Sequence, residues 1–171
     1  MAAFVLFLSG PPKAGKSRLR GDIYRFLATS GRRSWFVQAF SPDCEGQWVH
    51  DAHALGRGEE AENRARSFKN ALKKSGAFFS PAFVMAMCRQ LRGLCAAFEL
   101  VVADLGGLPS PENGEIVGAA EEASISAVVL LGPDGGDGGW IQWWRARGVE
   151  PFVARYREDL AEEVLALHHK A

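Results

Sequence analysis

The chain has 171 residues, of which 47% are hydrophobic and 23% are charged. These proportions are ordinary for a globular protein, and the length allows one full hydrophobic core, so we expect a single domain over residues 1–171. The 20 basic and 20 acidic side chains cancel, so the net charge does not indicate a nucleic-acid partner or a membrane surface. We expect no signal peptide and no membrane span. The three cysteines lack a metal-pair spacing, and the sequence therefore predicts a cytoplasmic protein.

The first predicted elements flank a glycine-rich segment. An apolar run over residues 4–8 is typical of a buried parallel strand. Residues after 17 predict a helix, because apolar side chains recur there at helical spacing: Leu19, Ile23, Phe26 and Leu27. Between them, residues 10–17 read Gly-Pro-Pro-Lys-Ala-Gly-Lys-Ser and fit G-x-x-x-x-G-K-[ST] at every fixed position. A glycine turn that arose by chance is the alternative, but strand, loop and helix together favour a phosphate-binding site.

In such a loop the backbone N–H groups surround the phosphates, because a loop that ends at a helix start leaves them without intrahelical acceptors. Lys16 is expected to bridge the β- and γ-phosphates, and the Ser17 hydroxyl is expected to bind Mg²⁺. The predicted nucleotide-contacting residues are Gly10, Pro11, Pro12, Lys13, Ala14, Gly15, Lys16, Ser17 and Gly107.

A second strand is predicted over residues 34–40, and a polar loop follows over residues 41–46. A phosphotransferase needs a group that orients the attacking hydroxyl or takes its proton. Asp43 is our candidate for this role, with Glu45 as second choice. The alternative is that Pro42 and Asp43 form only a turn, since Ser-Pro-Asp is ordinary turn chemistry.

Two helices are predicted next. One covers residues 59–74, and the other has Ser80 as N-cap, Pro81 in its first turn and an end near residue 98. The first helix is rich in positive charge, from Arg64, Arg66, Lys69, Lys73 and Lys74. These side chains either clamp the phosphates of an acceptor or form a solvated helix face.

A third strand, over residues 100–104, ends in a carboxylate. Asp104 is predicted to hold Mg²⁺ opposite Ser17, and Gly107 has the spacing of an Asp-x-x-Gly element whose N–H contacts a γ-phosphate. The alternative is that Asp104 only caps a turn. Leu105 stands where many motor-like ATPases have a catalytic glutamate, so the chain looks more like kinases and GTPases. A later strand ends without Asn-Lys-x-Asp, which favours ATP over GTP.

The remaining predicted elements are a helix over residues 111–121, a strand over 127–131, a helix over 140–147, a strand over 149–156 and a helix from 158. The helix over 140–147 carries Trp140, Trp143 and Trp144 at i, i+3 and i+4. Three interpretations stay open for them: packing against the sheet, a stacking platform for a base, or a docking face for a protein partner or a second copy of the chain.

Strands that alternate with helices predict an α/β, three-layer P-loop fold with about five parallel strands and helices on both faces. Ligands of such sheets bind at the carboxyl ends of the strands. Residues 9–10, 41–43, 104 and 132–134 all follow predicted strands, so we expect them to gather at that edge.

The chain resembles the P-loop NTPase superfamily over its full length. The motifs that carry this resemblance are residues 10–17 and 104–107. The stretch 100–156 is similar to the MinD and dethiobiotin-synthetase branch, although Pro11 stands where that branch often has a lysine. Residues 10–17, 41–48 (Ser-Pro-Asp-Cys-Glu-Gly-Gln-Trp) and 104–113 (Asp-Leu-Gly-Gly-Leu-Pro-Ser-Pro-Glu-Asn) also resemble the ATPase-like domain attached to a CRISPR-associated ring nuclease. That resemblance implies a prokaryotic antiviral setting and a nucleotide or cyclic-oligonucleotide substrate.

The function predicted from these residues is an ATP·Mg²⁺-dependent phosphotransferase (a kinase) that acts on a small molecule or a nucleotide. Lys16, Asp43 and Asp104 are its predicted catalytic residues, and Ser17 and Asp104 its metal ligands. One alternative is an ATPase that acts as an ATP-dependent switch or regulatory module. Another is a domain that binds nucleotide without catalysis. The acceptor substrate is left open, because acceptor pockets are built from loops without a shared code.

Overall fold

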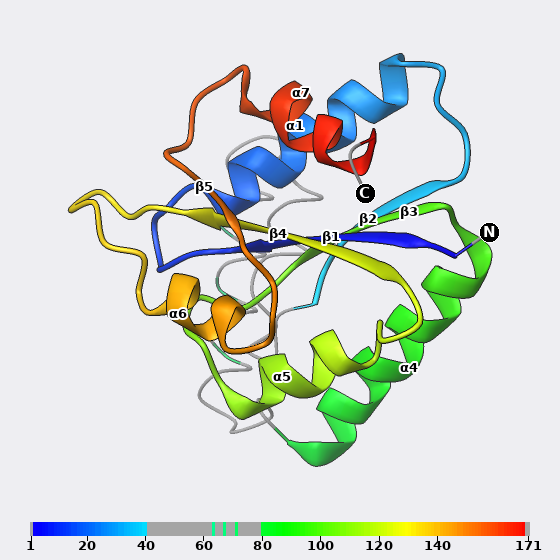
Figure 1. Ribbon diagram of the computed structural model, residues 1–171, viewed down its shortest axis with the longest axis horizontal. Coiled ribbons are helices and arrows are strands. Elements are labelled where there is room, and N and C mark those ends of the chain that lie inside the picture. The colour runs from blue at the N-terminus through cyan, green and yellow to red at the C-terminus, as the bar shows by residue number, and fades with distance from the viewer. Residues whose placement is uncertain (1, 41–62, 64–66, 68–70, 72–79, 170–171) are drawn as a thin grey trace.

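Five parallel strands form the centre of the molecule in the computed structural model, which describes residues 2–40, 63, 67, 71 and 80–169 (Figure 1). They are β1 (Phe4–Ser9), β2 (Trp35–Ala39), β3 (Leu100–Asp104), β4 (Ser124–Leu130) and β5 (Phe152–Ala154). Their order in the sheet is β2-β3-β1-β4-β5, and every pairing is parallel. Strand β1 is therefore central, with β3 on one side and β4 on the other.

Helices cover both faces of this sheet, as Figure 1 shows. Helix α1 (Lys16–Thr29), helix α7 (Leu160–Leu165) and the 3-10 turn η1 (Ala166–His169) lie on one face. Helices α4 (Pro81–Ala97), α5 (Pro111–Gly118) and α6 (Trp140–Arg145) lie on the other. None of the helices in the described ranges is long and apolar enough to cross a membrane.

The alternation of side chains along β1 builds two hydrophobic layers. Leu6 and Leu8 are fully buried in the layer under α1 and α7, whereas Val5 and Phe7 are fully buried in the layer over α4, α5 and α6. A strand that is buried on both faces needs a continuous apolar sequence, which is what residues 4–8 provide. The three-layer α/β fold predicted from the sequence is confirmed.

Each helix and strand described here was predicted from the sequence, but several of the predicted ends differ from the observed ones. Strand β4 begins at Ser124, three residues before the predicted start, because Ser124 pairs with Phe4 at the amino-terminal end of both strands, where its polar side chain is exposed. Strand β5 is only three residues long, and α5 ends at Gly118. The predicted helix over residues 59–74 and the loop over 41–46 lie outside the described residues, apart from residues 63, 67 and 71.

Two helices begin with a serine cap followed by proline. The Ser80 hydroxyl accepts a hydrogen bond from the Phe83 N–H at 3.3 Å, and Ser110 accepts one from the Asn113 N–H at 3.2 Å. Serine satisfies a backbone donor that has no intrahelical acceptor, and proline has no N–H to satisfy in the first turn. The predicted cap at Ser80 is confirmed.

Candidate functional site

A cavity of about 680 Å³ opens at the carboxyl ends of the central strands. Most of its wall is the segment from residue 12 to residue 18, which leads from the end of β1 into α1. Asp104 and Leu105 at the end of β3 and Tyr156 after β5 complete the lining. The residues that line the cavity are Pro12, Lys13, Ala14, Gly15, Lys16, Ser17, Arg18, Asp104, Leu105 and Tyr156. Segments far apart in the chain thus meet where a parallel sheet is expected to bind its ligand.

The backbone of the glycine loop (residues 10–17) has three residues with positive φ. Gly10 has φ +143°, Lys13 +67° and Gly15 +94°. Gly15 is the N-cap of α1, and no side chain caps this helix start. The first N–H groups of a helix have no intrahelical acceptor, so the loop presents donors to an anion in the cavity.

The Lys16 ammonium lies inside the glycine loop. The side chain is 9% exposed, and Nζ donates to the carbonyl oxygen of Gly10 at 2.7 Å and to that of Pro11 at 3.2 Å. A buried ammonium needs acceptors, and the loop's own carbonyl groups provide them. A phosphate in the loop would offer the same ammonium a charged acceptor, which makes a stronger hydrogen bond than a carbonyl does.

Asp104 lies where the sequence placed it, at the carboxyl end of β3, and it is 5% exposed. The structure adds a partner that the sequence analysis did not consider. Arg20 on α1 is fully buried, and its Nη1 lies 3.0 Å from Oδ2 of Asp104. Ser17 and Asp104 both line the cavity, and hydroxyl and carboxylate oxygens are donors that suit Mg²⁺, so these residues fit a metal ion.

The Asp-x-x-Gly segment (residues 104–107) packs directly against the glycine loop. A Cβ atom added at Gly107 would lie 3.2 Å from Cγ of Pro12, so glycine allows this close approach. The Gly107 carbonyl accepts a hydrogen bond from Trp140 Nε1 at 3.3 Å. The two motifs singled out in the sequence are therefore in contact.

Asn113 is a residue that the sequence analysis missed. Its side chain is 1% exposed, its Nδ2 donates to the carbonyl oxygen of Leu108 at 2.9 Å, and its Oδ1 accepts from the Gly106 N–H at 3.4 Å. Asparagine offers a donor and an acceptor on one rigid amide, so Asn113 fastens the segment after Asp104 from both sides. The signal for this role is an asparagine in the first turn of α5, at a position that is buried.

Asn113→Ala is expected to destabilise the protein by about 1–3 kcal/mol, because buried backbone groups lose their partners. Hydrogen exchange at the backbone amides of residues 105–108 should accelerate, whereas exchange in β1 should change only as much as global stability does. The matched control is Gln90→Ala on α4, whose side chain makes one exposed hydrogen bond, to Gln38. Unchanged exchange at residues 105–108 in Asn113→Ala would contradict the fastening role.

Two tryptophans of α6 form hydrogen bonds with residues in or next to the two motifs. Trp144 is fully buried, and its Nε1 donates at 2.9 Å to the hydroxyl of Ser9, which donates in turn to the carbonyl oxygen of Val128 at 2.9 Å. Trp140 is also fully buried, so the packing interpretation is confirmed for these two side chains. Docking of a partner on the tryptophan helix stays a prediction. It would depend on Trp143, which is half-buried and therefore partly open to a partner.

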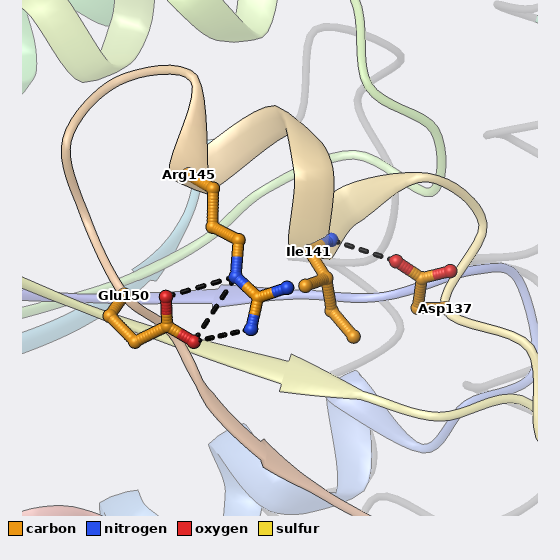
Figure 2. Close-up of polar contacts among 4 residues, drawn as sticks. All are labelled: Asp137, Ile141, Arg145 and Glu150. Carbon is orange, nitrogen blue, oxygen red and sulfur yellow. Dashed lines mark hydrogen bonds and ion pairs between the residues drawn. The ribbon is translucent and has the colours of Figure 1, made fainter.

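Both ends of α6 are fixed by polar contacts (Figure 2). Oδ2 of Asp137 accepts a hydrogen bond from the Ile141 N–H at 2.8 Å. At the other end Arg145 makes a forked contact with Glu150, with Nε 2.9 Å from Oε2 and Nη2 2.6 Å from Oε1. The hydrogen bonds from Arg145 lower the pKa of Glu150, so this pair stays charged through neutral pH. The two contacts connect both ends of the helix that carries the tryptophans to the chain segments beside it.

Tyr156 is a second residue that the sequence analysis did not assign to the site. Its side chain lies against the glycine loop, since a Cβ atom added at Gly15 would lie 2.9 Å from Cβ and 3.0 Å from Cγ of Tyr156. Its hydroxyl donates to Oδ2 of Asp22 on α1 at 2.8 Å. Burial raises the pKa of Tyr156, and this hydrogen bond raises it further, so the phenol remains a donor at neutral pH. Tyr156 thereby ties the segment after β5 to α1.

The predicted acceptor side of the site lies outside the described residues. This concerns the candidate base Asp43, its alternative Glu45 and the basic side chains between residues 64 and 74. Their roles stay predictions. The predicted site residues that the structure does describe are those of the glycine loop, Asp104 and Gly107.

Neither a protein-family model nor a curated protein matches the chain by sequence. Solved structures match it by shape. The APS kinase CysC of Mycobacterium tuberculosis, as a Cys556Ala mutant, superposes with a TM-score of 0.52 and 14% identity over 98% of each chain. The same kinase in complex with AMPPNP and APS gives 0.50 at 13% identity, again over 98% of each chain. The chain therefore shares the three-layer α/β P-loop fold of these structures. The resemblance to a CRISPR-associated domain stays a prediction.

Proposed function

We propose that this protein binds ATP with Mg²⁺ and transfers phosphate to a small molecule or a nucleotide. The observation that carries the proposal is the position of the Lys16 ammonium. It is buried within a glycine loop that lines a cavity of about 680 Å³, and the Asp104 carboxyl group belongs to the same lining. Ammonium, helix N-terminus and carboxylate are the parts that phosphoryl transfer needs.

Each part has one role in this proposal. The loop N–H groups and Lys16 would bind the β- and γ-phosphates, and the Gly107 N–H would contact the γ-phosphate. Ser17 and Asp104 hold Mg²⁺, which supplies charge for the transferring group. Asp43 orients the acceptor hydroxyl and takes its proton. The likeness to a kinase whose structure contains AMPPNP and APS supports a nucleotide on the loop side of the site.

Replacing Lys16 by methionine tests whether its ammonium group binds the phosphates of ATP. A charge-assisted hydrogen bond contributes about 1.5–3 kcal/mol, so Lys16→Met is expected to weaken ATP binding by about 10- to 150-fold. Isothermal titration calorimetry with ATP, ADP and GTP on the full chain measures this. Arg25→Met is the matched control, because it removes one exposed cation from the same helix, where Arg25 pairs with Asp22. If the unaltered chain binds no purine triphosphate, the proposal is wrong.

The second candidate function is an ATP-dependent switch. The contact that favours it is the hydrogen bond from Trp140 to the Gly107 carbonyl, which would connect α6 to the residue predicted to contact the γ-phosphate. A kinase loses ATP faster when its acceptor is added, whereas a switch changes self-association or partner binding between ATP and ADP. Measuring ADP release with a panel of small hydroxyl and phosphate acceptors, beside sedimentation in both nucleotides, separates the two functions.

A further inference from the structure

Three charged side chains are buried in the part of the chain that the structure describes, and all three lie at the candidate site. They are Lys16, Arg20 and Asp104, with exposed fractions of 9%, 0% and 5%. Lys16 and Asp104 belong to the two motifs. Arg20 belongs to neither of them, yet it is the most deeply buried of the three.

The position of Arg20 on α1 brings its side chain to Asp104 at the end of β3. It follows Ser17 by three residues on α1, so both side chains lie on the same side of the helix. From there its guanidinium reaches the end of β3, where Nη1 lies 3.0 Å from Oδ2 of Asp104. An arginine stays protonated in a protein, and a buried charge needs a partner of opposite sign. The Asp104 carboxylate is such a partner.

This pair changes the electrostatics of the candidate metal site. A triphosphate in the glycine loop would lie close to the Asp104 carboxylate, and two negative groups repel each other across a poorly screened cavity. In an ordinary site of this kind the metal ion offsets that repulsion. Here a guanidinium already does so from inside the protein, whether or not a metal ion is present.

We propose that Arg20 is a positioning residue that holds and neutralises Asp104 before Mg²⁺ arrives, so that nucleotide binds with little dependence on the metal. The inference rests on the proposed function and adds a property to the same site. Arg20 does not replace the metal ion in the reaction, because it is fully buried and does not belong to the cavity lining, whereas Asp104 does. It keeps the carboxylate oriented and its charge balanced in the metal-free state.

The test compares ATP affinity in excess Mg²⁺ and in EDTA, by calorimetry on the full chain. For the unaltered protein we expect the two dissociation constants to differ by less than about tenfold. In Arg20→Met the Asp104 charge faces the phosphates without its partner, and only Mg²⁺ can offset it. The ratio of the two constants should therefore rise by at least about tenfold, almost entirely through weaker binding in EDTA. Arg20→Lys should fall between the two, and the control Arg25→Met should match the unaltered protein.

A double variant keeps the test decisive if Arg20→Met folds poorly. Arg20→Met with Asp104→Asn removes both charges of the pair, and it should melt at a higher temperature than Arg20→Met alone. It should regain the affinity for ATP in EDTA that the single variant lost, and its response to Mg²⁺ should stay below about threefold.

Equal weakening of Arg20→Met with and without Mg²⁺ overturns the inference, since a merely structural arginine would act on both states alike. So does a double variant that binds ATP in EDTA no better than the single variant. Both results leave ATP binding by the unaltered chain intact. Absence of binding by the unaltered chain in either buffer instead removes the proposed function, and the inference with it.

Discussion

Gly10→Ala is expected to lower the free energy of unfolding by about 3 kcal/mol or more, a loss from backbone strain and steric overlap together. Gly10 has φ +143°, a conformation that side chains rarely adopt. A Cβ atom there would also lie 2.5 Å from the carbonyl oxygen of Leu130, at the end of the neighbouring strand β4. The overlap is with backbone atoms, so β1 and β4 must separate or the glycine loop must move.

Gly31→Ala is the matched control for this prediction. Gly31 also has a positive φ, +72°, but a Cβ atom added there meets nothing within 4 Å. It should therefore show the cost of the backbone conformation alone, about 1 kcal/mol. Urea denaturation of both variants measures the difference. Equal losses at Gly10 and Gly31 would show that β4 does not confine the start of the glycine loop.

Trp144→Ala should destabilise the protein by about 3–5 kcal/mol, the range for removing a fully buried large aromatic side chain. Its ring packs beside Phe7 of the central strand, with centroids 5.6 Å apart, and its Nε1 donates to the Ser9 hydroxyl. The variant therefore leaves a cavity under β1 and loosens the residue just before the glycine loop. We expect ATP affinity to fall as well, even at temperatures where the variant is folded.

Two further variants separate packing from the hydrogen bond at this position. Trp144→Phe keeps most of the ring but lacks the indole N–H, so it should lose about 1–2 kcal/mol. Trp143→Ala removes the half-buried neighbour of Trp144 and should be milder than Trp144→Ala. Thermal and urea unfolding rank the three. A larger loss in Trp143→Ala than in Trp144→Ala would contradict the role of Trp144 as the buried support of β1.

The tryptophan helix shows how far periodicity alone can go. The spacing of Trp140, Trp143 and Trp144 predicted a helix but left three interpretations open. The structure selects burial for Trp140 and Trp144, because each indole N–H finds an acceptor far away in the sequence: the Gly107 carbonyl after β3 and the Ser9 hydroxyl at the end of β1. The contact between Trp144 and Ser9 spans 135 residues, and no local pattern encodes such a distance.

Arg20 is the clearest residue that sequence analysis passed over, although a signal existed. The buried positions of α1 include residues 16, 19, 20, 23 and 27, so the helical period places Arg20 within the apolar stripe. An arginine in such a stripe needs an anion nearby. The sequence alone does not say which of its acidic residues that anion is, because the answer depends on which strand lies beside α1.

The sequence by itself determined the local features of this protein. The strand, glycine loop and helix over residues 4–29, the serine cap of α4 and the alternation of strands with helices follow from apolar period and turn chemistry within short windows. The tertiary structure alone decided the strand order β2-β3-β1-β4-β5, and with it the meeting of Asp104, Arg20 and Tyr156 around the loop. The physical reason is that burial favours any arrangement that covers the apolar faces, whereas packing and the pairing of buried charges select one of them.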